Sequence, residues 1–169
     1  MELETKVLSR ELQQRMYDNG LSIGTAESCT GGRVAEAVIA TPGASKYFKG
    51  GVICYSNEVK ENLLGVSPQV LAEKSAVSEE VAVQMVKGAC ETLKTDYAMA
   101  VTGYAGPVAG ENDGVPVGTI WVACGMKEKT LTLKLNEDFG RDINLAIATN
   151  RALRLMLDFL EQEKGTTEE

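Results

Sequence analysis

The stretch GTAESCTGG, from Gly24 to Gly32, decides the fold that we expect for this chain. It has the composition of a strand that runs into a glycine-bearing turn and then into a helix. The first N–H groups of a helix have no partner within the helix, and the helix dipole is positive there, so a helix start can hold an anion. Because a carboxylate, hydroxyls and a thiol lie close to that start, this stretch is predicted to form part of a ligand-binding site.

Outward from this stretch, the chain alternates between helical and strand patterns. Apolar residues at helical spacing, together with serine caps, predict helices over about 5–19, 30–40, 57–64, 78–94 and 143–164. Short apolar runs predict strands over 21–26, 50–55, 97–102, 117–125 and 130–135, the last two as an antiparallel hairpin. Such alternation is typical of an α/β fold, and we predict a three-layer α/β/α sandwich with a mixed, mostly parallel sheet.

The chain has 169 residues, which fits a single domain of ordinary size. No internal repeat or linker divides it, so we expect one domain over residues 1–164 and a disordered tail over residues 165–169. A glycine-rich loop, Gly103 to Pro116, follows the third expected strand and is predicted to act as a lid or a binding loop.

The composition excludes several classes of function. A formal net charge of −7 without a dense cluster of Lys and Arg argues against nucleic-acid binding. No window is apolar enough for a membrane span, and the first residues, MELE, lack the pattern of a signal peptide, so we expect a cytoplasmic protein without membrane attachment. The chain contains no histidine, which removes Ser-His-Asp and Cys-His catalysis and the commonest transition-metal ligand.

The four cysteines are widely spaced and form no C-x-x-C pair, so in a reducing compartment we expect free thiols. Cys54, Cys90 and Cys124 are predicted to be core thiols. Cys29 is less certain, because a helix start lowers the pKa of a thiol.

Motifs of common nucleotide-binding and hydrolase folds are absent, including the P-loop, the dinucleotide fingerprint and the G-x-S-x-G elbow. A hydroxyl nucleophile can still act if a neutral lysine serves as its base. Ser45 precedes the second expected strand, and Tyr55 and Lys60 follow it. Tyr55 and Lys60 are predicted to face one cleft.

Five motifs occur in order along nearly the whole chain. They are AESCTGG at 26–32, GVICYSN at 51–57 with Lys60, TGYAGP at 102–107, PVGT at 116–119 and FGR at 139–141. Together they closely resemble the CinA C-terminal domain family. The resemblance implies a nicotinamide-nucleotide amidohydrolase, which converts nicotinamide mononucleotide to nicotinate mononucleotide and ammonia in pyridine-nucleotide salvage, with no metal and no other cofactor.

The resemblance also implies the catalytic roles of four residues. Ser45 matches the nucleophile of family members, and Tyr55, Lys60 and Arg141 match its partners. Lys60 would accept the Ser45 proton directly or through Tyr55, and Ser45 would attack the carboxamide to form an acyl-enzyme. Arg141 would hold the substrate phosphate or keep Lys60 neutral. Backbone amides near Ser45 or in the loop 103–106 are candidates for the oxyanion site.

The substrate implied by the resemblance is a small-molecule nucleotide. Its ribose phosphate would lie at the helix start, where Thr30, Gly31 and Gly32 allow a close backbone approach. Its cationic pyridinium ring would favour Glu27 or the ring of Tyr104. The other residues expected to bind it are Ser28, Thr102, Gly103 and Gly106.

The chain departs from the family pattern at two places. Val108-Ala109-Gly110 stands where relatives commonly carry a glycine pair, which we expect to stiffen or reshape the loop. Asn144 stands where a second arginine is common, which we expect to weaken phosphate binding. The chain also lacks the larger N-terminal domain of full-length CinA proteins, so we expect no pyrophosphatase activity of that domain.

Three alternatives to this function remain open: a nucleotide-binding module without catalysis, an amidase for another small carboxamide, and thiol catalysis by Cys29. Exposed strand edges and a cleft near the last helix favour self-association, so we expect a homo-oligomer, with a dimer favoured.

Overall fold

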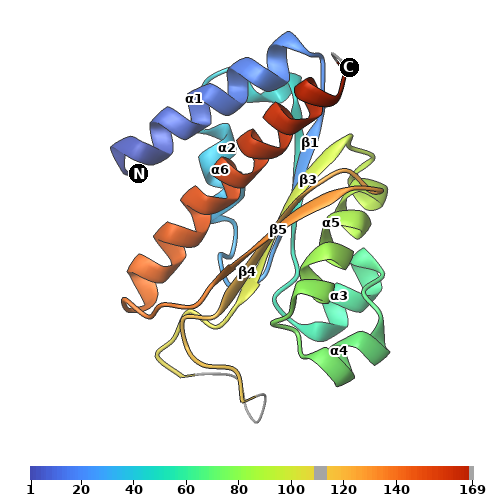
Figure 1. Cartoon of the computed structure of the whole chain (residues 1–169), viewed down its shortest axis with the longest axis vertical. Coiled ribbons are helices and arrows are strands. Elements are labelled where there is room, and N and C mark those ends of the chain that lie inside the picture. Colours follow the sequence, from blue (N-terminus) through green and yellow to red (C-terminus); the bar gives the residue numbers. More distant parts are fainter. Residues whose placement is uncertain (109–113, 168–169) are drawn as a thin grey trace.

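A computed structural model describes residues 1–108 and 114–167 of the chain. Within these residues, five strands form one sheet in the order β2-β1-β3-β4-β5 (Figure 1). β1 pairs in parallel with β2 and β3, whereas the pairs β3–β4 and β4–β5 are antiparallel, so β4 alone runs against the other described strands. The bounds are β1 Ile23–Glu27, β2 Phe48–Ile53, β3 Tyr97–Gly103, β4 Ile120–Gly125 and β5 Thr130–Leu135.

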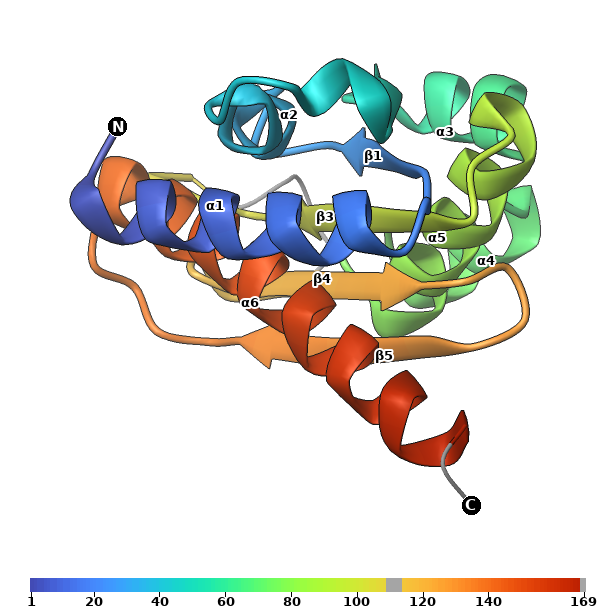
Figure 2. The ribbon, with the colours of Figure 1, turned by 90° about the horizontal axis from the view of Figure 1, so that it is seen from above.

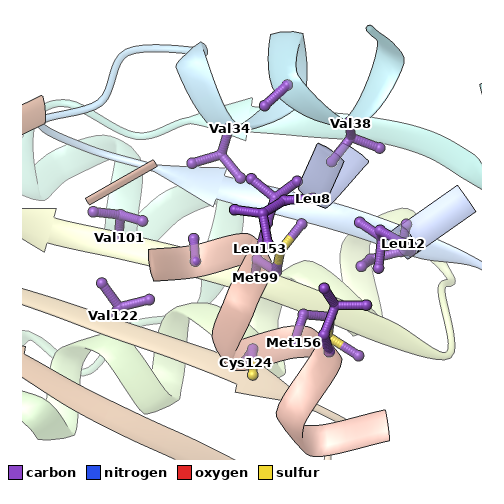
Figure 3. Close-up of a cluster of buried hydrophobic side chains, with 14 of the residues drawn as sticks. Leu8, Leu12, Val34, Val38, Met99, Val101, Val122, Cys124, Leu153 and Met156 are labelled. Carbon is purple, nitrogen blue, oxygen red and sulfur yellow. The ribbon is translucent and has the colours of Figure 1, made fainter. Parts of the chain in front are cut away.

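Helices cover both faces of this sheet, which confirms the α/β/α sandwich (Figures 1 and 2). One face carries α1 (Leu3–Asp18), α2 (Arg33–Ile39) and α6 (Arg141–Thr167). The other carries α3 (Asn57–Leu64), α4 (Pro68–Lys74) and α5 (Glu79–Leu93). Figure 3 shows the first of the two cores, in which apolar side chains of the three helices meet those of the strands: Leu8, Leu12, Val34, Val38, Met99, Val101, Val122, Cys124, Leu153 and Met156.

The helix starts illustrate which local signals the sequence carries. Ser56 caps α3, since its hydroxyl accepts a hydrogen bond from Val59 N at 3.2 Å, and Ser78 caps α5 in the same way. The sequence analysis missed α4, although Ser67 caps it and Pro68 occupies its first position. No helix in the described residues is long and apolar enough to cross a membrane.

Helix α6 corrects the prediction of a disordered tail from residue 165. It extends to Thr167, so Gly165 to Thr167 are helical, and residues 168–169 lie outside the described residues. Two hydroxyls in this last turn, Thr166 and Thr167, donate to carbonyl oxygens four residues earlier. These local bonds satisfy carbonyl groups near the end of the helix. Gly165 therefore does not end the helix.

The chain connections create a crevice where β1 and β2 end. β1 leads into α2 on one face of the sheet, and β2 leads into α3 on the opposite face. In an open α/β sheet, ligands bind at the carboxyl ends of strands where the connections diverge in this way. Side-chain alternation assigns the two residues at the end of β1 to different faces: Glu27 points to α2, and Ser28 points to α3.

Candidate active site

A cavity of about 410 Å³ lies at the carboxyl ends of β1, β2 and β3. Four segments form its walls: the turn after β1, the end of β2 with the start of α3, the segment between α4 and α5, and the loop after β3. The first residue of α6 completes it. Its lining residues are Ser28, Cys29, Tyr55, Asn57, Lys60, Ala76, Val77, Thr102, Gly103, Tyr104, Ala105, Gly106, Val108 and Arg141.

A buried serine and lysine meet at the base of this cavity. Lys60 Nζ lies 2.9 Å from Ser28 Oγ and 2.8 Å from the carbonyl oxygen of Cys54. The lysine side chain starts in the first turns of α3 and points back toward the end of β2, the direction that helical side chains favour. Lys60 is only 1% exposed, so its amine is largely shielded from bulk solvent. Ser28 is therefore in direct contact with a potential base.

The surroundings of Lys60 favour its neutral form. Burial lowers its pKa from the ordinary value of 10.5, and the neighbouring thiols of Cys54 and Cys29 oppose this only in part. None of the ion pairs among the described residues includes Lys60. A neutral amine can donate one N–H to the Cys54 carbonyl and accept the hydroxyl proton of Ser28 with its lone pair. This is the geometry that a lysine base requires.

Glu27 occupies the start of α2 instead of the cavity. Its carboxylate is 1% exposed and accepts hydrogen bonds from Thr30 Oγ1 at 2.7 Å, from Val34 N at 2.8 Å and from Ala35 N at 3.0 Å. The neighbouring N–H groups of this first turn, those of Arg33 and Glu36, donate to backbone carbonyls. The helix start is thus already satisfied by the protein's own carboxylate, which corrects the prediction that it holds a substrate phosphate.

The turn between β1 and α2 fixes the position of Ser28. Ser28 N donates to Val101 O at 2.9 Å, and Gly31 N donates to Ser28 O at 3.1 Å. Gly31 and Gly32 adopt positive φ angles of 57° and 107°, which permit the sharp reversal from strand to helix. Together with the Glu27 bonds, these contacts hold the serine at one place on the rim of the sheet.

Two polar side chains shape the cavity walls. Thr102 Oγ1 donates to Ala76 O at 2.8 Å, which ties the segment between α4 and α5 to the end of β3. Arg141 Nη1 donates to Gly106 O at 2.7 Å, which ties the start of α6 to the loop after β3. Burial raises the pKa of Cys29, and the charge of Arg141 opposes this in small part. Arg141 therefore supplies positive charge to the cavity that Ser28 lines.

The Cys29 thiol is unsuited to be the nucleophile. Its side chain is buried, and this burial raises its pKa to about 12. The lowering of this pKa expected from a helix start does not prevail, because burial is the largest influence on it and raises it. A thiolate would therefore be scarce at neutral pH, in contrast to the adjacent serine with its contacting amine.

Comparison with known proteins identifies the family of this chain. The sequence matches the family described as CinA C-terminal domain over residues 5–160. The chain belongs to the CinA C-terminal domain family. Protein YdeJ of Escherichia coli K12 is 39% identical over 153 residues, which cover 90% of this chain and 88% of YdeJ. A crystal structure of an E. coli CinA-superfamily protein has a TM-score of 0.87 at 38% identity and covers 90% of this chain and 88% of that one.

A CinA-family relative with an enzymatic name is also similar. The nicotinamide-nucleotide amidohydrolase PncC of E. coli K12 is 42% identical over 120 residues, which cover 71% of this chain and 72% of PncC. Other relatives are longer: the match spans only 37% of the CinA-like protein of Shewanella denitrificans. The family is thus found in proteins of different length.

The CinA-family cavity gathers most of the residues that the sequence analysis predicted. Those that line it are Ser28, Tyr55, Lys60, Thr102, Gly103, Tyr104, Gly106 and Arg141. Glu27, Thr30, Gly31 and Gly32 do not line it and instead form the turn and helix start beside Ser28. The hydroxyl of Thr30 and the carboxylate of Glu27 bond to each other, so neither is presented to a ligand.

Ser45 is the predicted site residue that the structure moves farthest from its expected place. It lies exposed in a short 3₁₀ turn, Ala44–Lys46, at the amino end of β2, whereas Lys60 follows the carboxyl end of that strand. The six residues of β2 separate the two ends by roughly 20 Å at about 3.3 Å per residue. The expectation that Lys60 accepts the Ser45 proton, directly or through Tyr55, is therefore wrong.

Some cavity residues escaped the sequence analysis. Asn57, Ala76 and Val77 line the cavity; Asn57 belongs to the motif GVICYSN but was given no role, and Ala76 and Val77 belong to no motif. Ala76 and Val77 reach it because α5 packs on the sheet, an effect of tertiary structure that local sequence does not encode. Val108 lines the cavity and is 81% exposed, while Ala109 and Gly110 of the same predicted departure lie outside the described residues.

Proposed function

We propose that this CinA-family protein hydrolyses the carboxamide of nicotinamide mononucleotide to nicotinate mononucleotide and ammonia, with Ser28 as the nucleophile and Lys60 as the base. The observation that carries this proposal is the 2.9 Å contact between Lys60 Nζ and Ser28 Oγ at the base of the cavity. The name of the relative PncC supplies the substrate class. Ser28 takes the role that the sequence resemblance gave to Ser45.

The chemistry requires proton transfers through one lysine in both the acylation and the deacylation step. Neutral Lys60 accepts the proton of Ser28 while Ser28 Oγ bonds to the carboxamide carbon, and a tetrahedral intermediate forms. The protonated lysine then gives this proton to the leaving nitrogen, the C–N bond breaks, and ammonia departs. Lys60 then takes a proton from a water molecule, whose oxygen attacks the carbonyl carbon of the resulting ester. The bond to Ser28 Oγ breaks, Lys60 returns the proton to Ser28 Oγ, and the acid is released.

One of the backbone N–H groups predicted to stabilise the oxyanion is already bonded within the protein. Within the loop 103–106, the N–H of Tyr104 already donates to Thr119 O at 3.0 Å, so it is unavailable to an oxyanion. The turn that follows Ser28 is adjacent to the nucleophile in the chain. We expect an N–H group of that turn to stabilise the tetrahedral intermediate.

The cavity also suits the two charges of the substrate. Arg141 offers a guanidinium to the phosphate, since its bond to Gly106 O uses only part of its five N–H donors. Tyr55, which is 65% exposed, and Tyr104 offer aromatic faces to the cationic pyridinium ring. A volume of about 410 Å³ is within the range of small-molecule sites.

The test is ammonia release from the purified protein with nicotinamide mononucleotide, measured by a coupled assay and confirmed by chromatography of the acid product. Free nicotinamide and nicotinamide adenine dinucleotide serve as comparison substrates. Release from the mononucleotide above both comparisons is the expected result. Calorimetric binding of the mononucleotide without release would instead indicate a binding module, and faster release from another carboxamide would identify a different amidase.

The biological setting follows from the same proposal. An enzyme with this activity would act in pyridine-nucleotide salvage in the cytoplasm. Strands β2 and β5 are the edges of the described sheet, and their unpaired backbone groups offer surfaces for self-association as a dimer. Analytical ultracentrifugation would test the dimer, and a monomer at micromolar concentration would contradict it.

A further inference from the structure

The side chain of Asn144, in the first turn of α6, connects the loop after β3, which lines the cavity, to the segment just before α6. It is 3% exposed. Its Nδ2 donates to Ala105 O at 3.0 Å and to Asp138 Oδ1 at 2.9 Å, and its Oδ1 accepts from Phe139 N at 2.9 Å. Asp138 Oδ1 also accepts from Gly140 N at 3.0 Å. One buried amide thus uses both of its polar atoms to join α6, the segment before α6 and the loop after β3.

The groups that Asn144 holds are neighbours of Arg141 or of its hydrogen-bond partner. Ala105, held by Asn144, directly precedes Gly106, whose carbonyl accepts from Arg141 Nη1 at 2.7 Å. Phe139, also held by Asn144, lies two residues before Arg141. Asn144 itself does not line the cavity that contains Ser28 and Lys60. It can therefore affect a ligand in that cavity only through the groups it holds.

We propose that Asn144 is a positioning residue, which fixes Arg141 and the loop 105–106 in the geometry that receives the anionic part of the substrate. This inference rests on the proposed function for the identity of that substrate. The sequence analysis expected Asn144 to weaken phosphate binding as a missing cation. The contacts give it a different role, because its amide donates to two oxygens and accepts from a backbone N–H, a set that no guanidinium can make.

The chain provides a matched control on the same helix. Asn150 is 8% exposed, and its Oδ1 accepts a hydrogen bond from Thr5 Oγ1 of α1 at 2.7 Å. The variants Asn144→Ala and Asn150→Ala therefore remove the same side chain from the same helix, but only the first releases the loop after β3. A general loss of α6 stability would appear in both variants.

The first readout is independent of catalysis. Hydrogen exchange followed by mass spectrometry should show faster exchange in peptides that cover residues 103–107 and 137–141 of Asn144→Ala, and unchanged exchange there in Asn150→Ala. Equal exchange in the two variants would overturn the proposal. This readout tests whether Asn144 holds the loop after β3 even if the wild-type protein releases no ammonia from nicotinamide mononucleotide. A lack of ammonia release would reject the proposed function and leave the role of Asn144 to the exchange measurement.

The second readout separates positioning from general stability. For nicotinamide mononucleotide, Asn144→Ala should raise KM by about tenfold, the effect of about 1.4 kcal/mol of lost binding, with kcat within about threefold of wild type. In the Arg141→Ala background, Asn144→Ala should change KM by less than about twofold, because the group it positions is gone. A full tenfold effect in that background, or a KM for Asn144→Ala equal to that of Asn150→Ala, would overturn the proposal.

Discussion

Two serines of this chain, Ser28 and Ser45, lie in turns next to parallel strands, yet only Ser28 contacts a base. Ser45 is adjacent in sequence to Lys46, and both are exposed at the amino end of β2. Ser28 is 32 residues from Lys60 in sequence and 2.9 Å from it in space. The difference teaches that a serine needs a buried lysine in contact with it, at the carboxyl ends of the strands, to act as a nucleophile. Being next to a lysine in the sequence provides neither the burial nor the contact.

The largest effect should come from removing the two hydroxyls in turn. Ser28→Ala should lower kcat for nicotinamide mononucleotide by at least about a thousandfold, as loss of a nucleophile does in serine hydrolases. Ser45→Ala should retain wild-type kcat, because its hydroxyl is exposed at the other end of β2. Ammonia release measures both. An active Ser28→Ala variant, or a folded but inactive Ser45→Ala variant, would contradict the assignment of Ser28 as the nucleophile.

The lysines provide the next test. Lys60→Met should lower kcat by about 10² to 10⁴, the contribution of a general base, and Lys46→Met should have no effect. Burial lowers the pKa of Lys60 from 10.5, so kcat/KM of the wild type should rise with pH and reach a plateau with an apparent pKa below that value. A flat pH profile, or equal activity in the two lysine variants, would contradict the role of Lys60.

Lys60 should also affect stability with a defined sign. Its pKa is lower in the folded than in the unfolded state, so between these two values the unfolded chain binds more protons. The free energy of unfolding should therefore rise with pH in the window that ends near 10.5. At pH values below that window, the folded state is destabilised by the full cost of keeping a charged amine buried. Lys60→Met removes this cost, and thermal melts at neutral pH should show an equal or higher Tm, whereas a large decrease would contradict the assignment.

The turn that holds Ser28 offers a smaller effect. Glu27→Ala leaves the N–H groups of Val34 and Ala35 and the hydroxyl of Thr30 without their acceptor. The free energy of unfolding should fall by about 3 kcal/mol, since each buried group left unpaired costs about 1–3 kcal/mol, and activity should fall with it. Glu36→Ala, at an exposed position of the same helix, should change stability by less than about 0.5 kcal/mol. Urea titration compares the two, and equal midpoints would show that the carboxylate of Glu27 does not hold the turn.

The smallest effect is expected at Tyr55. Because Lys60 contacts Ser28 directly, no phenol is needed as an intermediary. Tyr55→Phe should therefore change kcat by less than about threefold, in line with a ring that lies 65% exposed at the mouth of the cavity. A loss as large as that of Lys60→Met would show that the Tyr55 hydroxyl relays the proton.

Much of the fold could be predicted because its signals are local. Ser56 and Ser78 cap helices that were expected there, and the short apolar run over 130–135 predicted the strand that is β5. Helix α4 was missed although its Ser67-Pro68 start carries a local signal. The extension of α6 to Thr167 was missed because Gly165 suggests a helix end.

The candidate site was only partly predictable. Tyr55 and Lys60 were expected to face one cleft because they follow the second strand, and the family resemblance added Arg141 and assigned the nucleophile to Ser45. The side-chain period of a strand assigns Glu27 and Ser28 to opposite faces, and this much can be read from the sequence. Which face carries the lysine depends on how β1 and β2 pair and on where α3 packs. The anion site predicted at the start of α2 failed because the motif's own carboxylate occupies it.

The most direct test of the central claim is to trap the acyl-enzyme. The wild-type protein is mixed with nicotinamide mononucleotide, quenched in acid within the first turnovers, digested and analysed by tandem mass spectrometry. The account predicts an adduct with the mass of the acyl group of nicotinate mononucleotide on Ser28, and none in Ser28→Ala. An adduct on Ser45 or Cys29, or rapid turnover in Ser28→Ala, would contradict it.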